Sequence, residues 1–400
     1  MLRRLAGGIV LVGLATAITA AIRVPSNVGP KDQLAVHEWG TFTSIAGDDG
    51  RAIEWLPLGG PTDLPCFVQH FNNSNVVKFL PGEDARLIDY ETARSKLWGK
   101  VRMETPVLYF YGARQTDVKV RVRFPRGLIT EWYPQATPFH VGVTATALRH
   151  PQFFSQLDWT SVNVSAGSAS QFPTEPGKSH YYAARGTDAL PLRVGSQNEK
   201  FLFYRGVANF DVPLTARVVA GDAIELQNLG SDPIPSVVLF ERRGQSIGYR
   251  IGGSLRGRMT LAAPSRTATL ESLHADLEKM LIDAGLYPKE ASAMLETWRD
   301  SWFEDGTRVF YIVPSRSVDA ILPLTITPVP TDIKRVFVGR MEVVTASTQQ
   351  TVEAAIRNKD SAVLERYAAS SAPSPIESLR RNLARPTPFE RRRQWRTHHT

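Results

Sequence analysis

The chain has 400 residues, 42% of them hydrophobic and 22% charged, and a formal net charge of +8. This composition is typical of a folded globular protein and excludes an intrinsically disordered chain. The net charge comes from the two ends of the chain. Ten of the 47 basic residues and two of the 39 acidic residues lie outside residues 24–375, so this central part has no formal net charge. A neutral body lacks the basic surface of nucleic-acid-binding proteins, so we expect no nucleic-acid partner.

Residues 1–21 have the three parts of a secretory signal peptide. Two arginines stand near the start, an apolar run follows, and small residues lead up to Ala21. We therefore predict cleavage after Ala21 and a periplasmic or secreted mature protein. Further along, no apolar run reaches the roughly 18 residues that span a bilayer, so the mature chain is expected to have no transmembrane span.

Residues 22–34 contain Pro and Gly and predict a flexible leader, after which residues 35–265 predict a β-rich body. An Asp-Gly pair at Asp49-Gly50 separates two strand-like runs, which is a hairpin signal. The clearest strand is residues 118–124, where apolar and basic residues alternate, so that one face enters the core and the other faces water.

Short strand patterns continue between residues 201 and 251, at a spacing typical of a sandwich or barrel. Residues 151–200 are rich in Ser, Gly, Pro and Asn, and they predict a long loop.

Residues 266–306 predict an αα-hairpin inserted into the β structure. Leucines recur every three or four residues from Leu270 to Leu281, Gly285 suits a helix C-terminus, and Pro288 suits the start of a second helix. Strands at 307–345 complete the body, helices follow at 346–369, and residues 370–400 form a basic mobile tail. The predicted fold is mainly β (α+β): an antiparallel β-sandwich-like body with an inserted αα-hairpin and a helical C-terminal extension.

Several catalytic motifs are absent from the sequence. It contains no Gly-x-Ser-x-Gly elbow and no glycine-rich phosphate loop, and His37-Glu38 does not begin a zinc-protease helix because Thr41 stands where the second histidine would be. Cys66 is the single cysteine, which excludes an internal disulfide and a cysteine-rich zinc site.

Scattered histidines are the candidate metal ligands. Imidazole is the commonest metal ligand in proteins, and separate strands can bring such side chains to one point. The candidate ligands are His37, His70, His140 and His180, and a site built from three of the histidines plus Glu104 or Glu131 would suit zinc or copper. Alternatively, each histidine satisfies a local hydrogen bond.

Aromatic and acidic side chains supply the other candidates. Adjacent aromatics on a strand point to opposite faces, so we expect one of each pair to be exposed for ligand binding in Trp132-Tyr133 and Tyr181-Tyr182. The alternative places these rings in the core. Carboxylates among apolar neighbours can act as general acids or bases, and the candidates are Glu38, Glu104 and Glu131.

The basic stripe of Lys119, Arg121 and Arg123 has two readings. It binds an anionic polymer, or it keeps an edge strand from pairing with another molecule. The arginine tail is expected to contact anionic surfaces.

Three hypotheses for the function follow from the sequence. The first is an exported cell-envelope protein that binds a carbohydrate or peptide-like ligand in an aromatic-lined cleft. The second is an exported metal-dependent enzyme, a hydrolase or oxidoreductase, with a histidine-based site. The third is a structural partner protein that docks through its helical hairpin and basic tail.

Overall fold

The computed structural model describes residues 33–59, 64–73, 86–112, 114–168, 171–177 and 179–360. The predicted signal peptide at 1–21 and basic tail at 370–400 lie outside the described residues, as do residues 22–32 of the leader and 361–369 of the C-terminal helices. No helix within the described part is long and apolar enough to cross a membrane.

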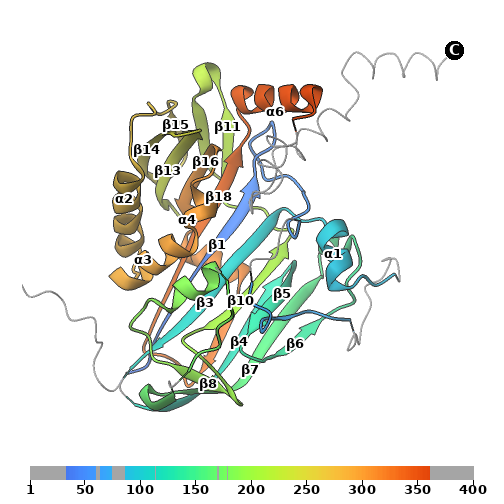
Figure 1. Ribbon diagram of the computed structural model, residues 1–400, viewed down its shortest axis with the longest axis vertical. Helices are drawn as coiled ribbons and strands as arrows, with labels where there is room; N and C mark the ends of the chain where they lie inside the picture. Colours follow the sequence, from blue (N-terminus) through green and yellow to red (C-terminus); the bar gives the residue numbers. More distant parts are fainter. Residues whose placement is uncertain are drawn as a thin grey trace, which may run out of the picture.

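The largest element is a nine-stranded sheet in the order β14-β13-β16-β18-β1-β3-β10-β5-β2 (Figure 1). Its strands are β1 (Ala35–Ile45), β2 (Gln69–His70), β3 (Val101–Tyr111), β5 (Gly127–Tyr133), β10 (Leu202–Ala208), β13 (Ile234–Arg243), β14 (Ser246–Leu255), β16 (Gly306–Ile312) and β18 (Asp332–Val343). Among the described strands, β1 and β18 are parallel neighbours and the other pairs are antiparallel. Every residue of β3, β5, β10 and β16 is buried, because both faces of the sheet are covered.

A six-stranded sheet packs against one face of the nine-stranded sheet. Its strands are β4 (Thr116–Pro125), β6 (Thr137–His140), β7 (Phe154–Val164), β8 (Leu192–Val194), β9 (Gln197–Glu199) and β17 (Leu324–Thr327). The inward side chains of β4 and β7, such as Val120 and Trp159, share a core with Phe42 and Leu128 of the larger sheet. A smaller sheet contains β11 (Leu214–Val218), β12 (Ile224–Asn228) and β15 (Arg258–Leu261).

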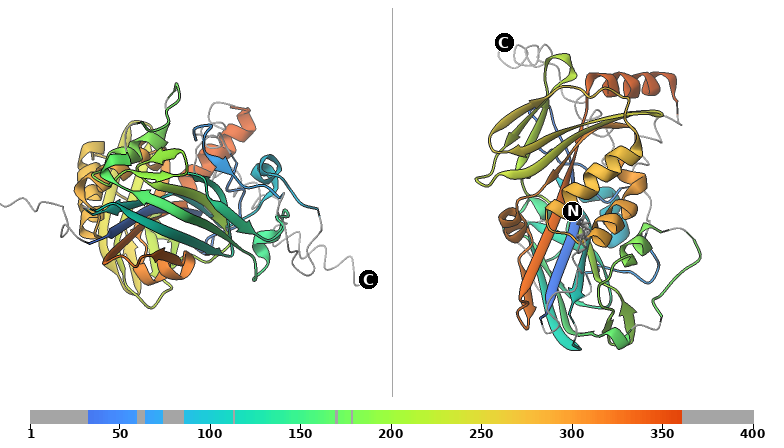
Figure 2. Two further views of the ribbon diagram at one scale, coloured as in Figure 1. Left: turned by 90° about the horizontal axis from the view of Figure 1, so that it is seen from below. Right: turned by 90° about the vertical axis from the view of Figure 1, so that its left-hand side faces the viewer.

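Helices cover part of the other face of the nine-stranded sheet, as Figure 1 and the right-hand view of Figure 2 show. The helical hairpin contains α2 (Leu270–Asp283) and α3 (Pro288–Thr297), followed by α4 (Arg299–Trp302). Leu277 and Trp302 pack with Trp39 and Phe310 of the sheet in a second core. The Thr269 side chain caps the start of α2, where it accepts a hydrogen bond from the backbone of Ser272.

The remaining helices are short or peripheral. They are α1 (Tyr90–Lys96), α5 (Ser315–Ile321) and α6 (Ala346–Asn358), with 3-10 turns η1 (Ala147–Arg149), η2 (Ala166–Ser168), η3 (His180–Arg185) and η4 (Ala220–Asp222). The structure confirms the predicted fold class: a mainly β body of packed sheets, an inserted αα-hairpin and a helical segment toward the C-terminus.

Two local predictions were wrong. The expected loop at 151–200 contains the eleven-residue strand β7, whose buried positions Leu157 and Trp159 alternate with polar ones. The run after Asp49-Gly50 turns back as predicted, but it forms only isolated bridges, such as Ala46 with Ala52, and no strand.

Candidate functional site

A pocket of about 460 Å³ lies where β2, β5 and β6 approach one another. We call it the aromatic pocket, and it is lined by Cys66, Val68, Gln69, His70, Asn72, Trp132, Ala136, Pro138, Phe139 and His140. The pairing of β2 with β5 positions one wall, since Gln69 lies opposite Trp132 and accepts a hydrogen bond of 2.9 Å from its indole. Three sequence-predicted residues, His70, Trp132 and His140, therefore meet in one place.

A buried ion pair supports the His70 wall. The His70 ring stacks on Tyr90 at 4.5 Å, and the Tyr90 hydroxyl donates to Glu131 at 2.5 Å. Glu131 also accepts hydrogen bonds from Thr130 and from Arg205, the latter at 2.7 Å. Burial alone would raise the pKa of Glu131, but the charge of Arg205 and these hydrogen bonds lower it below its usual value. This geometry favours a structural role for Glu131 in the pocket wall.

The opposite wall combines a fixed histidine with an exposed ring. The two ring nitrogens of His140 face the carbonyl oxygens of Val141 at 2.9 Å and Asn72 at 2.8 Å, so neither presents a lone pair to a metal. Phe139 is 37% exposed and packs on Phe154, with ring centroids 5.4 Å apart. The sequence analysis did not single out Phe139, because it predicted no strand at residues 137–140.

The four candidate metal ligands do not converge. His37 is buried under α3, where it contacts Glu290 at 2.8 Å, and His180 contacts Asp300 at 3.3 Å. His70 and His140 share the aromatic pocket. Within the described ranges, no three His, Cys, Asp or Glu side chains lie close enough together to hold a metal ion. The arrangement of these histidines instead matches the alternative of local hydrogen bonds.

The three candidate catalytic carboxylates share one environment: each is buried in the nine-stranded sheet beside an arginine. The ion pairs are Glu38 with Arg335 at 2.6 Å, Glu104 with Arg102 at 3.2 Å and Glu131 with Arg205 at 2.7 Å. A carboxylate used as a general acid needs access to substrate and a raised pKa. The geometry favours a structural role for all three.

Most of the predicted ligand-binding aromatics are in the core. Trp132 is 3% exposed and contributes to the aromatic pocket, whereas Tyr133 lies on the other side of β5 and contacts Phe67 at 4.7 Å. The opposite directions of these two rings were predicted correctly, but both faces of β5 are covered. Tyr181 and Tyr182 lie in η3 and not in a strand; Tyr181 is buried and Tyr182 half-buried.

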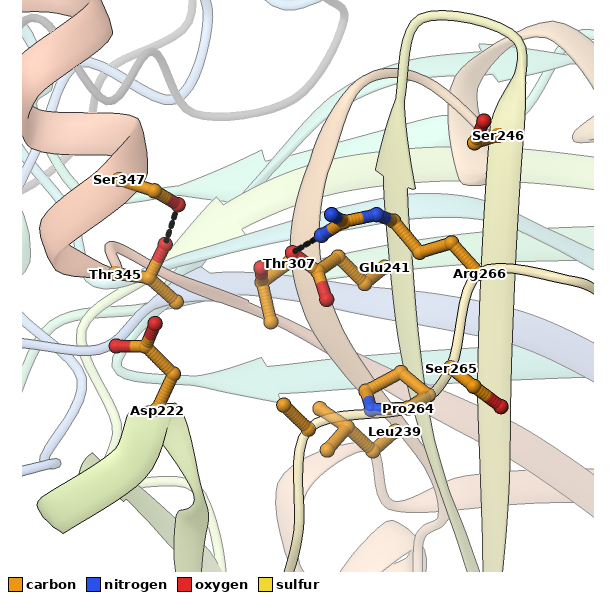
Figure 3. Close-up of a pocket in the computed structure, with 11 residues that line it drawn as sticks. Asp222, Leu239, Glu241, Ser246, Pro264, Ser265, Arg266, Thr307, Thr345 and Ser347 are labelled. Atoms are coloured by element: carbon orange, nitrogen blue, oxygen red, sulfur yellow. Dashed lines mark hydrogen bonds and ion pairs between the residues drawn. The ribbon is translucent and has the colours of Figure 1, made fainter.

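A second pocket, of about 620 Å³, was not indicated by the sequence (Figure 3). We call it the hydroxyl pocket, because Ser246, Ser265, Thr307, Thr345 and Ser347 line it together with charged and apolar residues. Glu241 in its wall contacts Arg266 at 3.1 Å and Arg243 at 3.3 Å, and the Arg243 guanidinium also donates to Thr307 and Thr345. Arg266 in the pocket lining and the neighbouring Arg243 thus both have partners within the protein.

No protein-family model matches the chain, and no curated protein is significantly similar to it. A function for this chain must therefore be argued from the arrangement of its own residues.

Proposed function

We propose that this chain is an exported cell-envelope protein that binds a carbohydrate or peptide-like ligand in the aromatic pocket. The observation that carries the proposal is the meeting of His70, Trp132 and His140, three residues far apart in the chain, beside the exposed ring of Phe139. The pocket volume of about 460 Å³ falls within the range of small-ligand sites.

The chemistry of the lining suits a sugar or an amide-bearing ligand. The Phe139 ring offers an apolar face that can stack on the C–H face of a sugar ring, and His70 offers a polar edge to its hydroxyls. The buried ion pair of Glu131 and Arg205 holds the wall behind His70, so the site is largely formed before a ligand arrives.

The two rival functions have less support. A metal-dependent enzyme requires converging ligands, and the described histidines are dispersed. For the docking protein, the αα-hairpin already packs its apolar side chains on the nine-stranded sheet, and the basic tail lies outside the described residues.

The ligand can be sought with the chain's single cysteine. Cys66 is exposed and lies on the wall of the aromatic pocket, so an environment-sensitive fluorophore attached there reports binding directly. Titrations would use glucose, xylose and N-acetylglucosamine oligosaccharides and a short alanine peptide. We expect saturable binding that Phe139→Ala weakens at least about tenfold.

The matched control is Ile251→Ala, which removes an apolar side chain that is 50% exposed on β14. It should leave binding unchanged. Saturation by none of the probes, or equal affinities of Phe139→Ala and the parent protein, would refute the proposal.

Export is tested separately by fractionating a bacterium that makes the full chain. The N-terminal sequence of the mature protein should begin at Ile22 in the periplasm or medium, as cleavage after Ala21 requires. Uncleaved protein confined to the cytoplasm would contradict the export part of the proposal.

A further inference from the structure

The basic stripe on β4 is not an edge feature. Lys119, Arg121 and Arg123 are exposed on the outer face of the six-stranded sheet, but β4 lies between β17 and β7. Protection of an edge strand therefore does not explain these charges, because both edges of β4 are already paired. Of the two hypotheses for the stripe, protection of an edge strand is excluded and binding of an anionic polymer remains.

The stripe is continuous with the aromatic pocket. Across the sheet, Arg123 lies opposite Gln156 of β7, which in turn lies opposite Phe139 of β6. The guanidinium of Arg123 lies 4.5 Å from the centre of the Phe154 ring, and that ring packs on Phe139. An exposed aromatic and cationic surface thus leads from the pocket onto β4.

The same strand register gives the distance between Lys119 and Phe139, the two ends of this surface. Lys119 is four residues along β4 from Arg123, and β4 is two strands away from β6. With about 3.3 Å per residue and about 4.8 Å between strands, Lys119 lies roughly 16 Å from Phe139 at the backbone. A ligand that touches both must be an extended chain of several units.

The charges on this surface favour an anion. The charged residues on the outer face of the described strands of the six-stranded sheet are Lys119, Arg121, Arg123, Arg193, Asp117 and Asp158. Asp158 pairs with Arg121 at 2.6 Å. Within the described residues, Lys119 and Arg123 have no carboxylate partner, so their charges are available to a ligand.

We infer that the ligand of the aromatic pocket is an anionic polysaccharide, with one unit stacked at Phe139 and the following carboxylated units over Arg123 and Lys119. This inference rests on the proposed function and narrows its ligand class. Stacking rings beside a few separated cations suit a polyuronate, whereas nucleic-acid binding draws on many phosphate contacts that this neutral body does not offer.

The test compares two polymers with the same backbone: polygalacturonate and its fully methyl-esterified form, which is neutral. Binding to the full mature chain is measured through the fluorophore on Cys66 at low ionic strength. We expect polygalacturonate to bind at least about tenfold more tightly, and this preference should disappear in about 0.5 M salt because the exposed charges are screened.

The decisive variant is Lys119→Gln with Arg123→Gln, which should remove the preference for the acidic polymer. The matched control, Arg256→Gln with Arg258→Gln, removes the same charge from exposed positions near β15 and should keep the preference. Circular dichroism of both variants checks that they fold.

The remaining outcomes overturn the inference in distinguishable ways. If neutral oligosaccharides or the esterified polymer bind through Phe139 as well as the acidic polymer does, the anionic class is wrong and the proposed function stands. If no saccharide or peptide probe binds, both fail. If a single-stranded oligonucleotide displaces polygalacturonate at equal charge concentration, the surface recognises polyanions in general, and the polysaccharide assignment is wrong.

Discussion

Replacement of Glu131 by Gln tests whether this residue is structural or catalytic. Its carboxylate accepts hydrogen bonds from Tyr90, Thr130 and Arg205 and is 2% exposed. The substitution keeps the shape but leaves the buried Arg205 guanidinium facing a neutral amide. Breaking a buried ion pair in this way costs about 3–5 kcal/mol, a large share of the 5–15 kcal/mol that stabilises a typical fold.

The effect should depend on pH in a defined direction. Because the pKa of Glu131 is lower in the folded chain than in the unfolded one, its stabilisation is complete above the unfolded value of about 4.3 and is lost as pH falls through the folded value. Urea unfolding followed by tryptophan fluorescence at about pH 7 and about pH 3 should therefore show a large loss for Glu131→Gln at neutral pH and a smaller one in acid.

Two further variants complete the experiment. Glu225→Gln removes a carboxylate from the surface pair with Arg217, where a loss below about 1 kcal/mol is expected. Combining Glu131→Gln with Arg205→Met removes both partners of the buried pair and should restore part of the lost stability. If Glu131→Gln alone stays within about 1 kcal/mol of the parent protein at neutral pH, the structural role assigned to this pair is wrong.

Two other predictions concern a glycine in the core and the single thiol. Gly339 of β18 lies opposite Tyr311 of β16, and a Cβ at Gly339 would overlap the buried tyrosine ring. Gly339→Ala should therefore reduce the free energy of unfolding, measured by urea titration, by about 1–3 kcal/mol. Tyr311→Leu should relieve most of that loss; an equal loss in the Tyr311→Leu background would contradict the overlap. A hydrogen bond with Glu175 raises the pKa of the Cys66 thiol. Glu175→Gln should therefore speed alkylation of Cys66 in the folded protein near pH 8. An unchanged alkylation rate would show that Glu175 does not control the reactivity of the thiol.

Local patterns predicted the parts of the fold that depend on one segment at a time. The alternation of residues 118–124 corresponds to β4, and the leucine spacing from Leu270 corresponds to α2. β7 was missed because Ser, Gln, Asp and Asn occupy its outward and end positions, which resemble a loop in composition. Its strand character comes from pairing with β4 on one side and β6 on the other, and neither partner is visible in its own sequence.

The aromatic pocket could be predicted from local sequence patterns even less than β7. Each of its predicted residues, His70, Trp132 and His140, stands out as a residue type, but their meeting depends on the register of β2 on β5 and of β6 on β7. The prediction that Tyr133 or Tyr181 is exposed was wrong, because both rings are buried in the second core, which the helices help to form. Whether a strand is covered on one face or both is a property of the whole fold.

The environment of the three buried glutamates explains why the binding proposal does not use them. A glutamate among apolar residues is compatible with a catalytic acid and with an ion pair, and only the partner distinguishes them. For Glu38 that partner is Arg335, 297 positions away in sequence but on the adjacent strand β18. The paired glutamates are buried inside the nine-stranded sheet, so a ligand-binding site is sought at its edge strand β2 and at the neighbouring β6 of the six-stranded sheet. The exposed Phe139 lies on β6, and two strands away on β4 lie Lys119 and Arg123, which have no carboxylate partner among the described residues, so the binding proposal rests on these side chains and not on the glutamates.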